Sequence, residues 1–225
     1  MHNDWKNIED FSLSNDGQWL VYEIKPLVGD GFVVVQNMES LEADTFQRAS
    51  GYKIDTENKY VAFQLAAPYD SVKAMKLRDV KEKDMPQDSL GVFVMQDDSV
   101  YKIENVKRFT LSGENASWIS YTIEDYKPEQ QEEDSKKKKK RKKKKKDEKK
   151  EAKAPKDKKN AIAIWNPLTG EKKVFEHASE IAFADEADAF AVFHFLKPNW
   201  DSLQISVFNN EQTAAYFAHA TEVQN

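Results

Sequence analysis

One stretch near the N-terminus carries the pattern that decides the fold: Phe11-Ser12-Leu13-Ser14-Asn15-Asp16-Gly17-Gln18-Trp19-Leu20-Val21-Tyr22-Glu23-Ile24. Its first four residues alternate between apolar and polar types, as in a half-buried strand. The Asn-Asp-Gly-Gln run is typical of a tight turn, because Asn, Asp and Gly tolerate the backbone angles that turns require. An apolar run that opens with an aromatic residue follows. The stretch therefore predicts two strands joined by a polar turn.

The same pattern occurs four times along the chain. In each copy, a short apolar strand and a polar turn precede a strand that opens with an aromatic residue. These four residues are Trp19, Tyr60, Trp118 and Phe190. A repeat of this kind indicates a fold assembled from similar units.

Two further strands complete each copy. The third strands are expected at residues 33–35, 92–94, 162–164 and 205–207. The fourth strands align apolar residues in two columns, Phe46, Ile103, Phe175 and Phe217, then Ala49, Val106, Ala178 and Ala220. The copies start at residues 11, 52, 109 and 181, which are 41, 57 and 72 residues apart. These spacings fit a unit of about 42 residues, with insertions of about 15 and about 30 residues in the second and third copies.

Four antiparallel strands in a unit of this length predict a β-propeller blade. A small sheet cannot cover both of its faces, whereas sheets stacked around an axis cover one another. We therefore expect an all-β chain with four four-stranded antiparallel blades, at about 11–51, 52–108, 109–180 and 181–222. A β-sandwich of short strands is the alternative, but it would not require a fixed repeat.

The C-terminal residues suggest that the repeat is cut short. Glu222-Val223-Gln224-Asn225 aligns with Glu180-Ile181-Ala182-Phe183, which opens the fourth unit. We expect the chain to be a fragment that stops in the first strand of a fifth blade. An open stack of blades exposes an apolar sheet face at each end, and such patches drive association. The chain is therefore expected to be oligomeric, aggregation-prone or dependent on missing blades.

Both insertions fall between the second and third strands of their units. The insertion at 70–88 has Ala74 and Leu77 at helical spacing and is expected to be a surface excursion with one or two turns of helix. A lid or a contact with another domain is the alternative for this segment.

The larger insertion, at 128–159, is rich in lysine. Residues 136–159 hold 17 Lys and Arg and 4 Asp and Glu, a local net charge of +13. The whole chain has a net charge of -5, so the other residues together carry -18. So many like charges predict a disordered loop. We expect it to be a solvated tether near its acidic body. A nucleic-acid or polyanion binder is the alternative.

Motifs of catalysis are missing from the sequence. The chain has no cysteine, so disulfides and thiolate chemistry are excluded, and it has no Gly-x-Ser-x-Gly, His-Glu-x-x-His, P-loop or Gly-x-Gly-x-x-Gly. His177 and His219 hold equivalent places in consecutive units, but Arg48 and Asn105 stand there in the other two. This column is therefore interpreted as a polar position. We assign no catalytic residue, no cofactor-binding residue, no metal-binding residue and no cofactor.

Several stretches of the chain carry a resemblance to a known family. They are Trp5-Lys6-Asn7-Ile8, the run Ser12–Tyr22, Gly29-Asp30-Gly31, Lys83-Asp84-Met85-Pro86-Gln87-Asp88-Ser89-Leu90-Gly91 and the lysine-rich loop. With these, the chain resembles the N-terminal β-propeller portion of prolyl oligopeptidase-family serine peptidases of the exported, Bacteroidetes type. The resemblance spans essentially the whole chain.

The resemblance implies a seven- or eight-bladed propeller that gates peptide access to a C-terminal α/β-hydrolase domain with a Ser-Asp-His triad. This sequence contains neither that domain nor the triad, so no catalytic residue is carried over and no hydrolase activity is expected from the chain alone. The implied partners are the missing blades, the hydrolase domain and, through that domain, a peptide substrate.

The resemblance also bears on location and on other partners. It implies an exported or periplasmic protein, although no signal peptide is visible in this chain. Neither a membrane nor a nucleic acid is expected as a partner. The alternative to the peptidase assignment is a free-standing propeller scaffold that binds a protein or polyanion through its loops.

Overall fold

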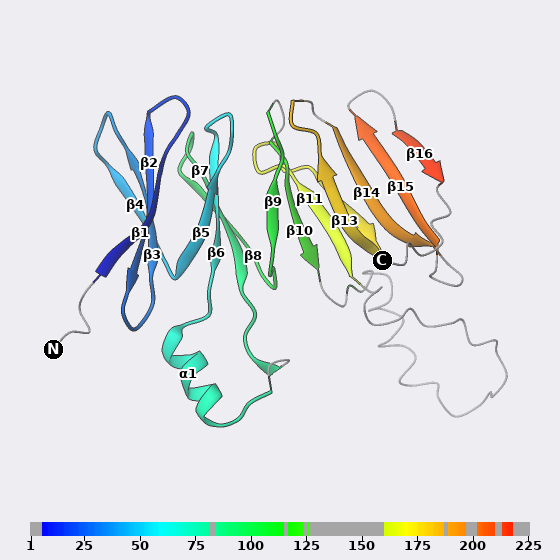
Figure 1. The fold of residues 1–225 in the computed structure, drawn as a ribbon. Helices are drawn as coiled ribbons and strands as arrows, with labels where there is room; N and C mark the ends of the chain where they lie inside the picture. The colour runs from blue at the N-terminus through cyan, green and yellow to red at the C-terminus, as the bar shows by residue number, and fades with distance from the viewer. Residues whose placement is uncertain are drawn as a thin grey trace. The chain divides into compact units, whose positions relative to one another are not determined.

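A computed structural model of the chain describes residues 6–81, 84–114, 117–123, 126, 160–186, 189–196, 202–209 and 213–217. These residues form four four-stranded sheets and little helix. In each sheet the four strands are neighbours in chain order, and the recorded strand pairs are antiparallel. The predicted all-β fold with four propeller blades is confirmed (Figure 1).

We number the blades in chain order. Blade one contains β1 (Lys6–Leu13), β2 (Trp19–Pro26), β3 (Phe32–Asn37) and β4 (Ala43–Gln47). Blade two contains β5 (Ala49–Ile54), β6 (Tyr60–Leu65), β7 (Ser89–Val94) and β8 (Ser99–Ile103). Blade three contains β9 (Phe109–Leu111), β10 (Ile119–Ile123), β11 (Ala161–Trp165) and β12 (Lys172–Glu176). Blade four contains β13 (Ala178–Phe183), β14 (Ala189–Leu196), β15 (Ser202–Asn209) and β16 (Thr213–Phe217).

The two predicted insertions have different outcomes. Helix α1 (Tyr69–Leu77) lies in the first, between β6 and β7, and none of its residues is buried. The lysine-rich segment at 128–159 lies outside the described residues. Within the described part of the chain, no helix has the length and apolar character needed to cross a bilayer.

The chain divides into two compact units. The first comprises residues 1–122, 164–173 and 183–188, and the second comprises residues 123–163, 174–182 and 189–225. Blades one and two lie wholly within the first unit.

The core of the first unit lies between blades one and two. Val21, Val33 and Val35 of blade one are fully buried and belong to the same hydrophobic cluster as Phe63 of blade two. Val33 and Val35 alternate along β3, and the strand pairing places Val21 on the same face. Val34, between them on the other face, is 5% exposed, so β3 is buried on both faces. The ring of Phe46, from β4, lies 4.7 Å from the ring of Phe63 and 5.2 Å from the ring of Phe93, measured between centroids.

Gly91 in β7 allows the aromatic contact between the blades. A Cβ atom built on this glycine would lie 2.2 Å from Cε2 of Phe63. Phe63 therefore occupies the space that a side chain at position 91 would fill. A glycine inside a strand often marks such a close approach.

The junctions between blades differ from the sequence prediction in one respect. The alignment placed Ala49 and Ala178 at the end of a fourth strand, but they are the first residues of β5 and β13. Arg48 alone separates Ala49 from β4, and His177 alone separates Ala178 from β12. Arg48 and His177 have positive φ angles, of 64° and 57°. A left-handed residue breaks strand geometry, so the chain turns into the next blade after only one residue.

Candidate functional site

The turns between the first and second strands of the blades are built alike. In blade one, Ser14 N–H donates to the carbonyl of Trp19 at 2.8 Å, and Trp19 N–H donates to Ser14 Oγ at 2.9 Å. Ser112 and Trp118 make the same pair of bonds in blade three, at 2.9 and 3.0 Å. Each serine thus fixes the aromatic residue that the repeat places at the start of the second strand.

Blade two uses a carboxylate in place of the serine hydroxyl. Asp55 N–H donates to the carbonyl of Tyr60 at 3.0 Å, and Lys59 N–H donates to Asp55 Oδ2 at 3.3 Å. The sequence did not distinguish this aspartate from other turn residues, although it follows Tyr52-Lys53-Ile54 as Ser14 follows Phe11-Ser12-Leu13.

Asp55 is an unusual carboxylate because it is buried, with 1% of its surface exposed. Burial raises the pKa of Asp55 to about 6, against the opposing effect of its backbone hydrogen bond to Lys59. Burial also raises the pKa of Tyr60, and the nearby Asp55 carboxylate raises it further. Burial of charge is unfavourable, so both groups are neutral over a wider pH range than free side chains.

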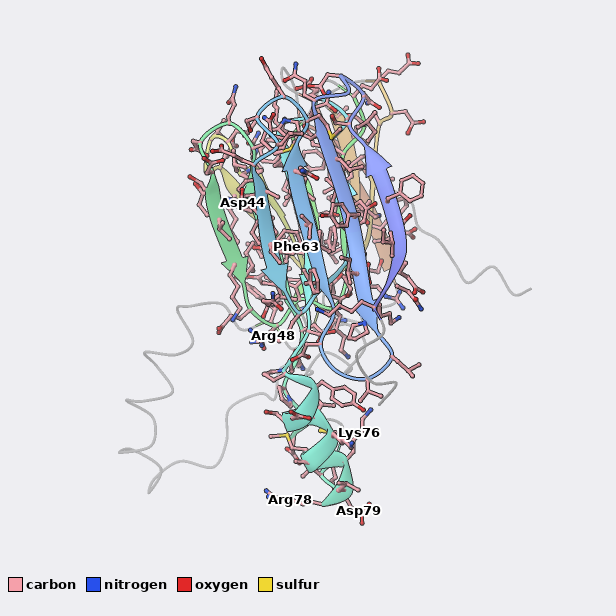
Figure 2. The ribbon with its side chains drawn as sticks, turned by 90° about the vertical axis from the view of Figure 1, so that its left-hand side faces the viewer. Asp44, Arg48, Phe63, Lys76, Arg78 and Asp79 are labelled. Atoms are coloured by element: carbon pink, nitrogen blue, oxygen red, sulfur yellow. The ribbon has the colours of Figure 1, made fainter. Side chains whose placement is uncertain are left out.

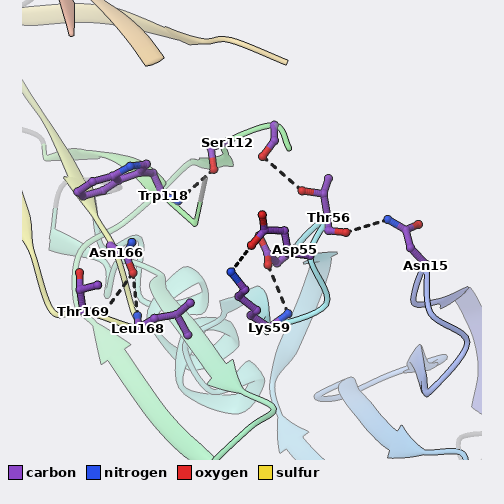
Figure 3. Close-up of polar contacts among 11 residues, drawn as sticks. Asn15, Asp55, Thr56, Lys59, Ser112, Trp118, Asn166, Leu168 and Thr169 are labelled. Carbon is purple, nitrogen blue, oxygen red and sulfur yellow. Dashed lines mark hydrogen bonds and ion pairs between the residues drawn. The ribbon is translucent and has the colours of Figure 1, made fainter. Parts of the chain in front are cut away.

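Hydrogen bonds also link the turns of different blades within the first unit (Figure 3). Asn15 Nδ2 donates to the carbonyl of Thr56 at 3.0 Å, and Thr56 Oγ1 donates to the carbonyl of Gly113 at 3.3 Å. Glu114 N–H donates to the carbonyl of Asp185 at 2.6 Å. The turns of blades one to four are therefore connected in series. The tightest contact is at Gly113, where an added Cβ would lie 2.2 Å from the Asp185 oxygen.

The backbone explains why the position that His177 shares with Arg48 and Asn105 in the aligned repeat units is polar. His177, Arg48 and Asn105 all have φ near +60°. A left-handed conformation disfavours β-branched residues and is commoner for Asn and His than for most others. The interpretation of this column as a polar position thus gains a physical reason. His219 and His2 lie outside the described residues, and the side chain of His194 is not described.

No cluster of three or more His, Cys, Asp or Glu suited to a metal ion occurs within the residues that the structure describes. The Ser14, Asp55 and Ser112 side chains accept hydrogen bonds from the backbone and hold turns in place. Apart from these turns, two exposed features stand out among the described residues: the surface of helix α1 and the outer face of blade one.

Helix α1 forms one of these surfaces. Its first residue is held to blade one, because Tyr69 N–H donates to Asp30 Oδ1 at 2.9 Å. Beyond that contact the helix projects from the end of the sheets (Figure 2). Its exposed residues include the basic side chains Lys73 and Lys76, and Leu77, which is 79% exposed.

The outer face of blade one forms the second surface. Phe11, Ile8 and Leu13 of β1 are 71%, 64% and 56% exposed. They lie on the face opposite the buried Val21 and Val33, and Figure 2 looks onto this side of the first sheet.

Comparison with known proteins supports the fold. No protein-family model matches the chain, and no curated protein matches it significantly. A structure from a study of two prolyl endopeptidases is similar over 96% of this chain and 30% of that chain, at 10% identity, with a TM-score of 0.52.

Two further peptidase structures are similar. The β-propeller domain of the Trilobed protease from Pyrococcus furiosus matches 96% of this chain and 59% of that chain, at 14% identity and a TM-score of 0.48. An acylaminoacyl peptidase in complex with Z-Gly-Gly-Phe-chloromethyl ketone matches 96% of this chain and 33% of that chain, at 11% identity and a TM-score of 0.45. The chain thus spans less than two thirds of each of these structures.

At these low identities the similarity establishes the fold and leaves the activity open. The chain is a β-propeller chain of four blades, and structures of prolyl endopeptidases and acylaminoacyl peptidase are among its structural neighbours.

Proposed function

We propose that this chain is the non-catalytic propeller portion of a prolyl oligopeptidase-like serine peptidase. One observation carries the proposal: almost the whole chain, 96%, is similar in fold to a prolyl endopeptidase structure. The resemblance of Ser12–Tyr22 and Lys83–Gly91 to that family supports it from the sequence. The Bacteroidetes type, export and membership of a seven- or eight-bladed ring are parts of the same proposal.

In this role the propeller would restrict which peptides reach an α/β-hydrolase domain that these 225 residues do not contain. A gate of this kind has to hold its blades at fixed spacing. The serial bonds between turns, from Asn15 to Thr56 and from Thr56 to Gly113, suit that requirement within the first unit. At Arg48 and at His177 a single left-handed residue connects one sheet to the next, so these connections are short.

The experiment that tests this proposal begins with the gene. The reading frame around these 225 codons should continue into further blades and a Gly-x-Ser-x-Gly motif. The longer protein should label with a fluorophosphonate and cleave proline-containing chromogenic peptides, and the 225-residue chain should do neither. A gene that encodes these 225 residues and nothing more would contradict the proposal.

The alternative function is a free-standing scaffold that binds a protein or polyanion. The exposed helix α1 with Lys73 and Lys76 is the observation that favours it, because a helix with no buried residue is free to contact a partner. Immobilised heparin should then retain the chain at low salt and release it as salt rises. Lys73→Glu together with Lys76→Glu should shift elution to lower salt, with Lys172→Glu and Lys173→Glu in blade three as the matched control.

A further inference from the structure

The turn between β5 and β6 joins blade two to residues of blades one and three, all within the first unit (Figure 3). Asn15 of blade one donates from its backbone N–H to Asn58 Oδ1 at 2.9 Å and from Nδ2 to the carbonyl of Thr56 at 3.0 Å. Thr56 Oγ1 donates to the carbonyl of Gly113, in blade three, at 3.3 Å. All of these bonds between blades therefore depend on the shape of one turn.

Asp55 holds this turn in shape. Its N–H donates to the carbonyl of Tyr60 at 3.0 Å, and its carbonyl accepts from the N–H of Asn58 at 2.9 Å. Its Oδ2 accepts from the N–H of Lys59 at 3.3 Å. Asn58, which accepts from Asn15, has a left-handed backbone with φ of 58°. The position of Asn58, and with it the link to blade one, thus depends on the hydrogen bonds of Asp55.

The second oxygen of the Asp55 carboxyl group is buried without a partner. Asp55 is 1% exposed and Tyr60 is fully buried, and among the described residues neither Asp55 Oδ1 nor the Tyr60 hydroxyl makes a hydrogen bond. A buried carboxyl oxygen with no donor is far more unfavourable when it is ionised than when it is protonated. The closed turn therefore fits a neutral carboxyl group.

The charged groups around Asp55 compensate its charge poorly. In its own turn, the ammonium group of Lys59 is already paired with the carboxylate of Glu57, and its effect on the pKa of Asp55 is smaller than that of burial. Lys53, on β5, lies over the ring of Phe109. The turns bonded to this one carry exposed carboxylates: Asp16 in blade one, Asp97 and Asp98 between β7 and β8, and Glu114 in blade three. Ionisation of Asp55 would therefore leave a charge inside the turn without a matching cation.

The equivalent turns of blades one and three have a serine at this position. Ser14 and Ser112 accept the corresponding backbone bond through a hydroxyl group, which carries no charge. We propose that Asp55 makes the link between blades one, two and three sensitive to protons. With the carboxyl group protonated the turn stays closed, and with the carboxylate ionised the turn loosens and the bonds of Thr56 and Asn58 to the other blades weaken. This inference does not rest on the proposed peptidase function.

The direction of the effect follows from burial. Opening of the turn exposes the carboxyl group to water, where its pKa returns to the ordinary value of 3.8 from about 6 in the closed turn. The open form therefore gains on the closed form as the pH rises. These two values correspond to an open population that is roughly tenfold larger at about pH 8 than at about pH 5.

Amide hydrogen exchange, read by NMR at about pH 5 and about pH 8, tests the proposal because it reports local opening. After correction for the intrinsic pH dependence of exchange, protection of the Asn15 and Asn58 amides should fall roughly tenfold from the lower to the higher pH. The Leu41 amide is the internal control, since it bonds to the carbonyl of Asn37 in the turn between β3 and β4. Its protection should stay constant.

Substitutions at Asp55 should abolish the effect. Asp55→Ser introduces the residue of the other two turns and should give the Asn15 and Asn58 amides equal protection at the two pH values. Asp55→Asn keeps the shape of the side chain and should do the same, and it replaces Asp55→Ser if circular dichroism shows that variant to be unfolded. Asp98→Asn removes an exposed carboxylate from a neighbouring turn and is the matched control, in which the tenfold fall should persist.

Three outcomes would overturn the proposal. One is constant protection of Asn15 and Asn58 in the wild-type chain, as expected if the Tyr60 hydroxyl donates to the ionised carboxylate and keeps the turn closed. Another is an equal fall at Leu41, which would indicate a general loosening of the blades. The third is a fall that persists in both Asp55 variants. None of these results bears on whether the longer gene encodes a peptidase.

Discussion

Arg48 and His177 occupy the same position in the first and the third junctions between blades and share a left-handed backbone, with φ of 64° and 57°. At the first junction, the N–H of Arg48 donates to the carbonyl of Gly31 in blade one at 2.7 Å. The carbonyl of Arg48 accepts from the N–H of Ala66 in blade two at 2.9 Å. A single residue thus ends one sheet and begins the next.

The first prediction concerns this backbone conformation. Arg48→Val should destabilise the chain by about 1–2 kcal/mol, because a β-branched residue is strained at positive φ. Arg48→Gly should cost less, since glycine adopts this conformation freely. Urea unfolding of the two variants measures the difference, and Thr45→Val on the neighbouring strand controls for the added valine. Equal stability of the Val and Gly variants would show that the conformation carries no strain.

The second prediction concerns the contact between Gly91 and Phe63. Gly91→Ala should destabilise the chain by about 1–3 kcal/mol, because its Cβ would overlap the Phe63 ring. Phe63→Leu alone should also destabilise, by loss of contacts with Phe46. The double variant should lose less stability than the sum of the two single losses, since the smaller leucine makes room for the methyl group of alanine. Strict additivity in this double-mutant cycle would contradict the proposed overlap.

The third prediction is a pH dependence set by Asp55. Burial raises the folded-state pKa of Asp55 from its ordinary value of 3.8 to about 6, so the folded state binds the proton more tightly than the unfolded state does. This group's contribution to stability is therefore full below about pH 4 and is lost as the pH rises through about 6. The loss is about 3 kcal/mol at most, from roughly two pKa units. Asp55→Asn should remove it, as measured by the free energy of unfolding between pH 4 and 7.

A neighbouring turn supplies the control for this pH experiment. The hydrogen bond from Ser14 lowers the pKa of Asp16. The contribution of Asp16 is therefore present above its ordinary pKa and lost as the pH falls, which is the opposite direction. Asp16→Asn should leave the loss of stability between pH 4 and 7 in place. If Asp55→Asn left it in place as well, another group would be responsible.

The sequence was sufficient to predict the sheets because the repeat fixes them locally. The aromatic residue of each repeat lies at the start of a second strand or within one residue of that start: Trp19, Tyr60, Trp118 and Phe190. Phe46 and Phe175 lie in β4 and β12, as the alignment predicts. The apolar alternation in such strands is a property of neighbouring residues, so it is visible without the structure.

The junctions and the links between turns could not be predicted in the same way. The column of Arg48, Asn105 and His177 showed polar residues, and only the backbone angles give the reason. Asn15 lies 41 residues from Thr56, and the repeat does not show which groups of successive turns meet. The burial of Asp55 likewise depends on how the sheets around it pack, which no local pattern records.

The last prediction concerns the turn-to-turn contacts, where backbone packing should matter more than a single side-chain bond. Thr56→Val removes the hydroxyl that donates to Gly113 and should cost about 0.5–1.5 kcal/mol, the usual net value of one hydrogen bond. Gly113→Ala should cost more, because its Cβ would meet the backbone oxygen of Asp185, which cannot move aside as a flexible side chain can. Ser99→Ala, on the edge strand β8, is the control. Unfolding in urea ranks the three variants, and the contact is refuted if Gly113→Ala is no more costly than Thr56→Val.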